Sequence, residues 1–297
     1  MLLTKKSNIY MDNPLVSIQI NCHNGERYLS EAIDSIYKQT YKNWEIIFWD
    51  NASSDTSAKI AKSYDGKLRY FLNKKKKSLG EVRFLASKKA KGEFLAFLDC
   101  DDEWLPEKLE NQLKCFENKD NLAVVYTNSE IINADSNFKY IQTKGELPRG
   151  NVFENLIKNN FIIFSSVMVD KKKFFQVGGF PKNFKNTTDY WLFLKLAEKF
   201  KFDAIDAICC KVKIHSNNLS DKQRVIAQKE SIKSLKSFLP NKNVERSLKY
   251  HYNLLSIAYL KEGYYFQCIY TLFKYNLWFL FIISIYNKLI KIYLSQK

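Results

Sequence analysis

The amino-acid sequence predicts an α/β fold in which a mainly parallel sheet is flanked by helices and followed by a helical C-terminal region. Residues 15–126 alternate apolar runs, typical of buried strands, with segments whose apolar residues recur at helical spacing. Strands that alternate with helices form right-handed βαβ units, and these units build a parallel sheet. From about residue 221 only helical patterns follow. We therefore expect one domain over residues 1–220 and a helical region over residues 221–297.

The first half of the chain supplies the expected strand–helix pairs. Leu29, Ala32, Ile33 and Ile36 lie at i, i+3, i+4 and i+7, which is the spacing of one helix face. Pro106 suits the first turn of a helix, where its missing N–H is not needed. The expected strands are 16–20, 45–49, 68–72, 94–98 and 122–126, and the expected helices are 29–36, 56–64, 81–91 and 106–117.

The segment from 127 to 220 is less regular. Leu192, Leu196 and Phe200 share one face of an expected helix over 189–200. Gly178 and Gly179 indicate a turn. Short strands are expected near 139–143 and 161–169, and one or two strands over 202–214.

Polar residues follow three of the expected strands at the point where each strand ends. The first strand runs into the turn 21–27, the second into Asp50, and the fourth into Asp99, Asp101 and Asp102. Ligands of open α/β sheets bind at the carboxyl ends of the strands. Three carboxylates within four residues repel each other unless a cation lies among them, so a divalent-metal site that holds a diphosphate is expected. The acidic string alone also fits a solvated turn with a helix N-cap.

The chain resembles the nucleotide-diphosphosugar glycosyltransferases of family two. The resemblance covers roughly residues 14–220 and implies their Rossmann-like GT-A fold. It rests on five ordered segments: VSIQINCHNGERYLSEAIDSIYKQTYKNWEIIFWDNASSDTS at 16–57, KKAKGEFLAFLDCDDEW at 88–104, VGGF at 177–180, TTDYWLFLKLA at 187–197 and KVKIHSNNLS at 211–220.

The resemblance implies roles for residues that would bind the donor. Asp50 matches the residue that binds the nucleobase, and the turn at 22–25, with Asn24, would lie over the base and ribose. Asp99 and Asp101 match the ends of a D-x-D motif. Asp99 would face the ribose or sugar, and Asp101 would bind Mg²⁺ or Mn²⁺ directly. Arg83 matches an arginine placed near the donor.

The resemblance also implies the catalytic residue. Asp189 matches the general base that takes the proton of the acceptor hydroxyl, and a single base with in-line attack implies inversion at the anomeric carbon. His215 matches a histidine that contacts the metal or the diphosphate, and Lys213 could add a cation for the leaving diphosphate.

Four residues depart from the family pattern. The family often has Asp where this chain has Asn51, Asn at Phe84, Glu at Thr188 and Asp at Trp191. Acceptor recognition and the surroundings of the base are therefore open. Trp191 could stack on a sugar or belong to a helix core.

The C-terminal region is basic. Residues 221–297 hold 13 Lys/Arg and 4 Asp/Glu, a net of +9, within a chain of +16. The uncharged run 275–287 is too short to span a membrane. Ser284, Asn287, Lys288, Lys291 and Ser295 form a polar stripe on an apolar helix, which fits a membrane interface. Docking on the catalytic domain or on a second subunit is the alternative.

We expect a metal-dependent inverting glycosyltransferase that moves a sugar from a nucleotide-diphospho donor, with UDP as the expected nucleotide, to a surface-glycan or lipid-linked acceptor. Six cysteines without metal-ligand spacing and no apolar signal peptide favour a cytoplasmic protein, peripheral on the anionic inner face of the cell membrane. Nothing indicates nucleic-acid binding, and the oligomeric state is open.

The sequence leaves two alternatives to this function. A nucleotidyltransferase on this fold would need a basic, glycine-rich loop after the first strand, and NCHNGERY holds one glycine. A non-catalytic nucleotide- or glycan-binding protein derived from the same fold is the second alternative, and Thr188 and Trp191 favour it.

Overall fold

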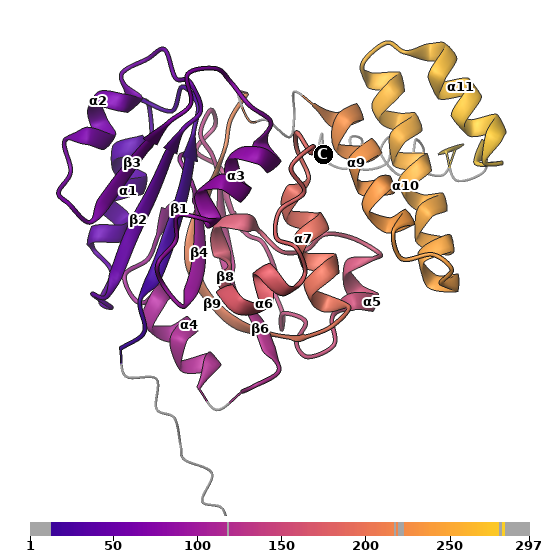
Figure 1. The fold of residues 1–297 in the computed structure, drawn as a ribbon. Helices are drawn as coiled ribbons and strands as arrows, with labels where there is room; N and C mark the ends of the chain where they lie inside the picture. The colour runs from indigo at the N-terminus through magenta and orange to yellow at the C-terminus, as the bar shows by residue number, and fades with distance from the viewer. Residues whose placement is uncertain (1–12, 118, 217, 219–222, 279–280, 283–297) are drawn as a thin grey trace, which may run out of the picture.

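The fold is known from a computed structural model that describes residues 13–117, 119–216, 218, 223–278 and 281–282. Its centre is a nine-stranded sheet with the order β3-β2-β1-β4-β8-β6-β9-β5, and β7 pairs with β6 (Figure 1). The strands are β1 (Val16–Cys22), β2 (Trp44–Asp50), β3 (Leu68–Leu72), β4 (Phe94–Asp99), β5 (Glu103–Trp104), β6 (Leu122–Asn133), β7 (Lys139–Ile141), β8 (Met168–Asp170) and β9 (Lys201–Ile214).

The parallel half of the sheet confirms the prediction from the first 100 residues. β1 pairs in parallel with β2 and with β4, and β2 pairs in parallel with β3. The register sets Cys22 beside Asp50 and Asn21 beside Asp99. The polar residues that end three strands therefore meet at one edge of the sheet.

The second half of the sheet differs from the prediction. β8 is antiparallel to β4 and β6, while β6 and β9 run in parallel. β6 continues to Asn133, beyond the predicted end at 126, because its pairing with β9 extends through residues 127–133, which begin with the polar run 127–130. The predicted strand over 161–169 is a 3₁₀ turn at Phe164–Ser166 followed by the short β8. Residues 202–214 lie in one strand, β9.

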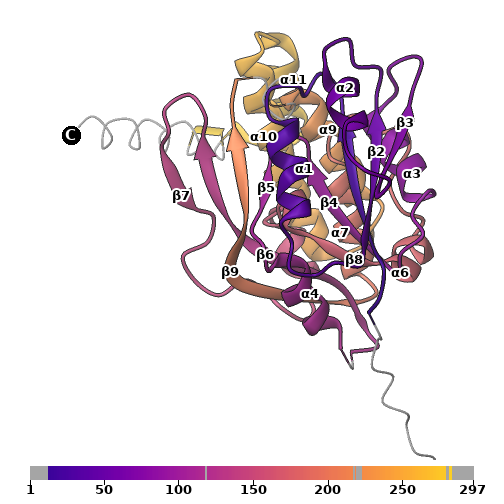
Figure 2. The ribbon, with the colours of Figure 1, turned by 90° about the vertical axis from the view of Figure 1, so that its left-hand side faces the viewer.

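Helices cover both faces of the sheet (Figures 1 and 2). On one face α1 (Leu29–Tyr37), α2 (Ser57–Lys62) and α4 (Lys108–Phe116) share a core with β1, β2 and β4. On the other face lie α3 (Leu79–Ser87), α6 (Lys171–Gln176) and α7 (Thr188–Ala197). A short α5 (Phe153–Leu156) packs against α7. Alternate residues of each parallel strand point to opposite faces, so a strand buried on both sides reads as a continuous apolar run.

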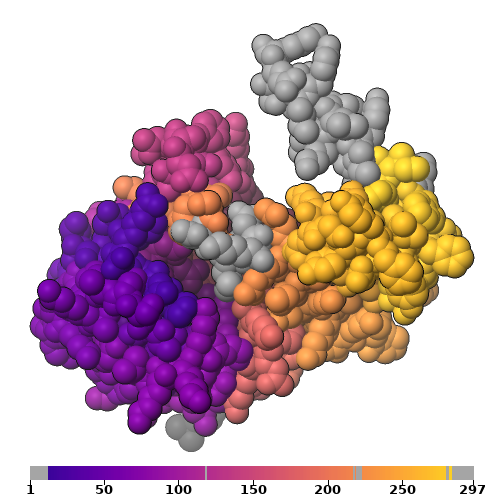
Figure 3. Space-filling model, turned by 90° about the horizontal axis from the view of Figure 1, so that it is seen from above, coloured from indigo at the N-terminus to yellow at the C-terminus, as the bar shows by residue number. Residues whose placement is uncertain are grey.

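The C-terminal helices continue the second core. α9 (Arg224–Lys236), α10 (Lys242–Lys261) and α11 (Tyr265–Lys274) stack beside α7 (Figure 1). Figure 3 shows them as a lobe next to the rest of the molecule. Val225, Ile232, Leu235 and Leu248 belong to the same buried cluster as Tyr190 of α7. α9 and α10 are therefore docked on the catalytic domain, which is the alternative that the sequence left open to a membrane helix.

Two predicted features lie outside the described residues. The polar stripe over 284–295 is one, and most of the uncharged run 275–287 is the other. Within the described ranges, the structure contains no helix that is both long enough and apolar enough to cross a bilayer.

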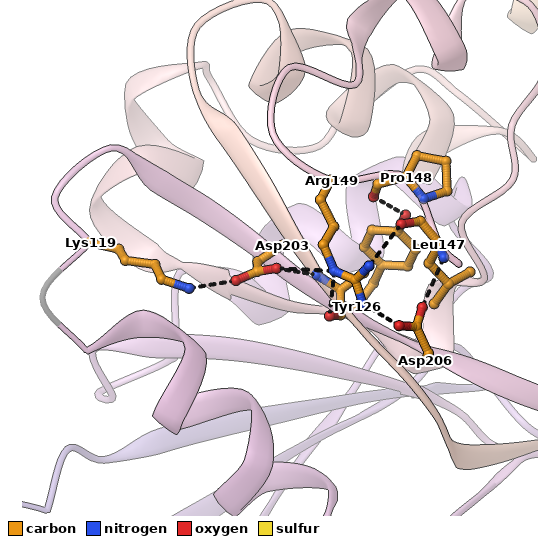
Figure 4. A network of polar contacts seen from close by, with 8 residues as sticks. Lys119, Tyr126, Leu147, Pro148, Arg149, Asp203 and Asp206 are labelled. Carbon is orange, nitrogen blue, oxygen red and sulfur yellow. Dashed lines mark hydrogen bonds and ion pairs between the residues drawn. The ribbon is translucent and has the colours of Figure 1, made fainter. Parts of the chain in front are cut away.

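An ion-pair network fastens the 147–150 segment to the first half of β9 (Figure 4). The Arg149 guanidinium contacts the carboxylates of Asp203 and Asp206, and Lys119 reaches Asp203 at 2.6 Å. The Leu147 backbone N–H donates to Asp206 at 2.8 Å. That hydrogen bond and the contact with Arg149 lower the pKa of Asp206, which favours its charged form. Because the network ties the 147–150 segment to β9, its role is structural.

Candidate active site

Two loops at the carboxyl edge of the sheet are joined by hydrogen bonds. The Asn24 backbone N–H donates to Ser53 Oγ at 3.0 Å, and the Ser54 N–H donates back to Asn24 Oδ1 at 2.8 Å. Glu26 completes the connection by accepting from the Thr56 N–H at 2.9 Å. Asn24 has a left-handed φ of 57°, a conformation that Asn tolerates better than most residues. The predicted donor residue Asn24 thus holds the loop in shape through its side chain.

Gly25 closes this loop against two cysteines. A side chain at position 25 would meet Cys22 Sγ at 2.8 Å and Cys100 Sγ at 2.9 Å, so a larger residue would not fit without displacing them. The Gly25 N–H donates to Ser57 Oγ at 3.0 Å, which links the β1 loop to the start of α2. The absence of a side chain keeps the ends of β1 and β4 close together.

Asp50 lies at the end of β2, beneath the same loop. One carboxylate oxygen accepts from the Ser53 N–H at 2.7 Å and the other from the Tyr70 hydroxyl at 2.7 Å. The residue is fully buried. Each oxygen has a second lone pair. Asp50 therefore shapes the turn at 51–54 and ties the end of β2 to Tyr70 of β3.

Arg83 and Asp99 form the central ion pair of this edge. Arg83 Nη2 lies 3.0 Å from Asp99 Oδ1, and Arg83 Nη1 donates to Thr188 Oγ1 at 2.8 Å. The guanidinium is buried over the Phe164 ring, 3.5 Å from its centroid, while the Asp99 side chain is 41% exposed. Arg83 therefore orients Asp99 toward solvent and connects β4 to the start of α7.

Asp101 faces His215, which follows β9. Asp101 Oδ2 lies 3.1 Å from His215 Nε2, and Asn218 Nδ2 lies 3.4 Å from the same oxygen. Burial, followed by the charge of Asp99, raises the pKa of Asp101, and the hydrogen bond from His215 opposes that rise. A cation placed here would be stabilised by the surrounding negative charge.

Asp102 has a different role from its neighbours. It is buried, and it accepts from the Ser165 hydroxyl at 2.5 Å and from the Lys213 N–H at 3.1 Å. Burial raises its pKa well above the usual value, with the charges of Asp101 and Asp99 adding to the rise. Ser165 also accepts from the Asp99 N–H at 3.0 Å, so it fixes the turn between β4 and β5. The sequence pattern offered no signal for Ser165, which lies far from this turn in the chain.

Lys213 pairs with two carboxylates. Its Nζ lies 2.7 Å from Glu103 and also contacts Glu31. These two carboxylates neutralise the ammonium group, so Lys213 ties β9 to β5 and α1.

Asp189 lies in the first turn of α7, next to Thr188. Asn160 Nδ2 donates to Asp189 Oδ2 at 3.2 Å. Burial raises the pKa of Asp189, while the charge of Arg83 lowers it in part. Its neighbour Thr188 contacts Arg83, so the predicted base lies close to the Arg83–Asp99 pair. Trp191 packs edge-on against Phe184, with the ring centroids 5.5 Å apart, as expected of a helix packing residue.

Glu230 of α9 holds the turn that precedes Asp189, and the sequence pattern did not indicate it. Its carboxylate accepts from three successive backbone N–H groups, those of Lys185 at 2.6 Å, Asn186 at 3.0 Å and Thr187 at 3.0 Å. A helix N-terminus leaves N–H groups without intrahelical partners and favours a negative charge. The C-terminal region thus supports the position of the predicted base.

Glu230→Ala is expected to destabilise the fold by about 1.5–3 kcal/mol, because charge-assisted hydrogen bonds to backbone N–H groups are lost. Turnover should fall more than donor affinity, since the change lies beside the base. Denaturant unfolding and steady-state kinetics measure the two effects. Glu245→Ala, at an exposed position of α10, is the matched control. If both variants behave alike, Glu230 does not position the turn.

Asp101 and His215 are suitable ligands for a divalent cation that also binds a diphosphate. No group of three His, Cys, Asp or Glu residues with metal-site geometry occurs among the described residues. Mg²⁺ commonly uses one or two carboxylates and takes its other ligands from substrate phosphates and water. Asp101 with His215 supplies such a partial set of ligands.

The sequence comparison agrees with this geometry. A family model described as Glycosyl transferase family 2 matches residues 17–176, which is more than half of the chain. The chain belongs to glycosyltransferase family 2.

Curated relatives extend the match of this family 2 glycosyltransferase. Over 213 residues it is 35% identical to the Escherichia coli UDP-Glc:alpha-D-GlcNAc-diphosphoundecaprenol beta-1,3-glucosyltransferase WfgD, covering 71% of this chain and 81% of the relative. It is 33% identical over 230 residues to an uncharacterized glycosyltransferase of Rickettsia felis, covering 74% of this chain and 38% of that protein. The chain thus spans under half of that second relative.

Solved structures share the fold. Staphylococcus aureus TarS 1-349 in complex with UDP-GlcNAc has a TM-score of 0.64 at 17% identity, with 88% of this chain and 80% of that chain covered. The mannosyltransferase PcManGT from Pyrobaculum calidifontis, in complex with GDP-Man and Mn²⁺, has a TM-score of 0.62 at 15% identity, with 84% and 76% covered. These matches confirm the predicted GT-A architecture.

Proposed function

We propose that this glycosyltransferase moves a sugar from a UDP-linked donor to a hydroxyl of a lipid-linked or surface-glycan acceptor, with inversion at the anomeric carbon. The observation that carries the proposal is the position of Asp189, a half-buried carboxylate in the first turn of α7, beside the Arg83–Asp99 pair. The names of WfgD and of the TarS complex support a UDP-sugar donor, and the name of WfgD supports a lipid-linked acceptor.

The proposed reaction assigns a role to each residue of the candidate site. Asp189 takes the proton of the acceptor hydroxyl as that oxygen attacks the anomeric carbon, and its raised pKa favours proton uptake. Asp99, oriented by Arg83, would accept hydrogen bonds from the ribose or sugar of the donor. Asn24 and Asp50 would shape the loop that covers the base and ribose.

The enzyme would use Mg²⁺ or Mn²⁺ held by Asp101 and His215. When bound, the ion supplies positive charge to the leaving diphosphate. His215 also stacks obliquely on Tyr28, with the ring centroids 5.4 Å apart, which keeps its imidazole near Asp101.

A direct assay tests the proposed function. UDP release from UDP-glucose and UDP-N-acetylglucosamine should occur slowly with Mn²⁺ and should stop when the ion is chelated. A protein that binds either donor in a calorimeter but releases no UDP would instead be the non-catalytic binder.

We also propose that the enzyme acts as a cytoplasmic protein peripheral on the anionic inner face of the membrane. α11 exposes an apolar face: Phe266 is 79% exposed, Ile269 57% and Phe273 80%. These residues lie at i, i+3 and i+7, so they share one side of the helix. The net charge of +9 over residues 221–297 adds attraction to anionic lipid.

Replacing both phenylalanines of this face, Phe266→Ser with Phe273→Ser, is expected to reduce the protein fraction that floats with anionic vesicles by at least about tenfold, because each buried Phe contributes about 1.5–3 kcal/mol. Phe138→Ser, at an exposed aromatic residue of the β6–β7 turn, is the control. If wild-type protein floats with neither neutral nor anionic vesicles, the membrane proposal is wrong.

A further inference from the structure

A pocket of about 400 Å³ lies where the start of α7 meets α9 and α10. The catalytic part contributes Thr187 and Asp189 to its lining, and the helices contribute Arg224, Gln228, Lys261 and an apolar side of α10. The predicted base is therefore part of the wall of a cavity that the C-terminal helices complete. Any molecule bound there would lie beside Asp189.

Two polar atoms of the lining residues are buried without a hydrogen-bond partner in the described structure. They are the Thr187 hydroxyl oxygen and Gln228 Oε1. Leaving a buried polar group unsatisfied costs free energy, so each such group in a native structure calls for a partner. A hydroxyl and an amide are suitable partners for sugar hydroxyl groups.

The charges on the lining are unequal. Arg224 and Lys261 are cationic, and among the residues that the structure describes Asp189 is the one acidic residue of the lining. Arg224 lies at the start of α9 and Lys261 at the end of α10. Guanidinium and ammonium groups bind phosphate oxygens by charge-assisted hydrogen bonds.

The pocket also has an apolar side. Leu254, Ile257 and Ala258, followed by Lys261, lie at i, i+3, i+4 and i+7 on one face of α10. α10 leads through Gly263 into α11, whose exposed apolar face was described above.

We propose that this pocket is the acceptor subsite and that it recognises a sugar joined to a diphosphate. This proposal rests on the proposed function. Thr187 and Gln228 would bind sugar hydroxyls, and Arg224 with Lys261 would bind the phosphates. The attacking hydroxyl oxygen forms a bond to the anomeric carbon and gives its proton to Asp189. The bond from that carbon to the donor diphosphate breaks, and UDP leaves with the electron pair.

Binding of two synthetic probes tests the subsite: octyl-diphospho-N-acetylglucosamine, and octyl N-acetylglucosaminide, which has no phosphate. Calorimetry with the full-length protein should show tighter binding of the diphosphate probe. Arg224→Gln and Lys261→Gln should each weaken that probe about tenfold, because each removes a charge-assisted contact, and should leave the glycoside unaffected. Arg246→Gln and Lys249→Gln, at exposed positions of α10, are matched controls.

The proposal is overturned if wild-type protein binds both probes equally. It is also overturned if the pocket variants lose both probes alike, or if the controls lose as much as the pocket variants. UDP release without acceptor is measured in parallel. Pocket variants that release UDP at the wild-type rate while losing the diphosphate probe would separate acceptor binding from donor chemistry. If no donor is hydrolysed by the wild type, the proposed function fails, and the probe affinities still decide the pocket.

Discussion

Asp189→Asn is expected to lower turnover by about 10²–10⁴-fold, the usual effect of losing a general base. The amide is nearly the same size as the carboxylate, and the hydrogen bond from Asn160 can be replaced by one to the amide oxygen. The asparagine amide, unlike the carboxylate, cannot take the proton of the acceptor hydroxyl. Donor affinity should be unchanged, because Asp99 and Arg83 remain in place.

The pH profile separates loss of the base from loss of structure. Burial raises the pKa of Asp189 above its usual 3.8. The base must be ionised to act, so wild-type transfer should decline as the pH falls toward this raised pKa, and the variant should lack that decline. Asp135→Asn, at an exposed residue of the β6–β7 turn, is the control. Near-normal transfer by Asp189→Asn would mean that another residue is the base.

The parallel half of the fold could be predicted because its strands are buried on both faces. Runs such as Phe94–Leu98 are apolar without interruption, and turns of polar residues delimit them. β5 has only two residues, and β6 continues through Thr127, Asn128 and Ser129, which are polar but buried. Their strand conformation depends on pairing with β9, a contact between distant segments that local pattern does not reveal.

The residues of the candidate site also fall into two groups, those that the sequence predicts and those that it does not. Asp50, Asp99 and Asp101 could be placed because each ends or follows a predicted strand, and adjacent parallel strands bring these ends together. Their supporting partners come from distant segments. Ser165 contacts Asp102 and the Asp99 backbone, and Glu230 holds the turn before Asp189. Serine and glutamate are common surface residues, so nothing in their local sequence sets them apart.

One departure from the family pattern gains a physical explanation. Thr188 stands where the family usually has Glu, and its hydroxyl accepts from Arg83 at 2.8 Å. A carboxylate at this position would add a second acid beside Asp189 and compete with Asp99 for the guanidinium. With Thr188, Arg83 can pair with Asp99 and still lower the pKa of Asp189. This arrangement favours the enzyme over the non-catalytic alternative that Thr188 had suggested.

Asp101→Ala is expected to reduce the metal-dependent part of donor affinity by at least about tenfold, because changes to metal-site residues commonly cost 10–100-fold in metal affinity. Asp101 and His215 are 3.1 Å apart, and the imidazole alone would be a weak site for Mg²⁺ or Mn²⁺. Calorimetric titration of UDP with Mn²⁺, and again with a chelator, isolates the metal-dependent part.

The expected result is a wild-type affinity for UDP that falls on chelation, and a variant affinity that is weak with or without Mn²⁺. Asp135→Ala serves as the surface control and should match the wild type. Because Asp99 and the loop around Asp50 remain in the variant, its metal-independent affinity should equal that of the chelated wild type. If Mn²⁺ strengthens UDP binding equally in the variant and the wild type, Asp101 is not a metal ligand. Any ion must then be held by the diphosphate with other residues of this edge.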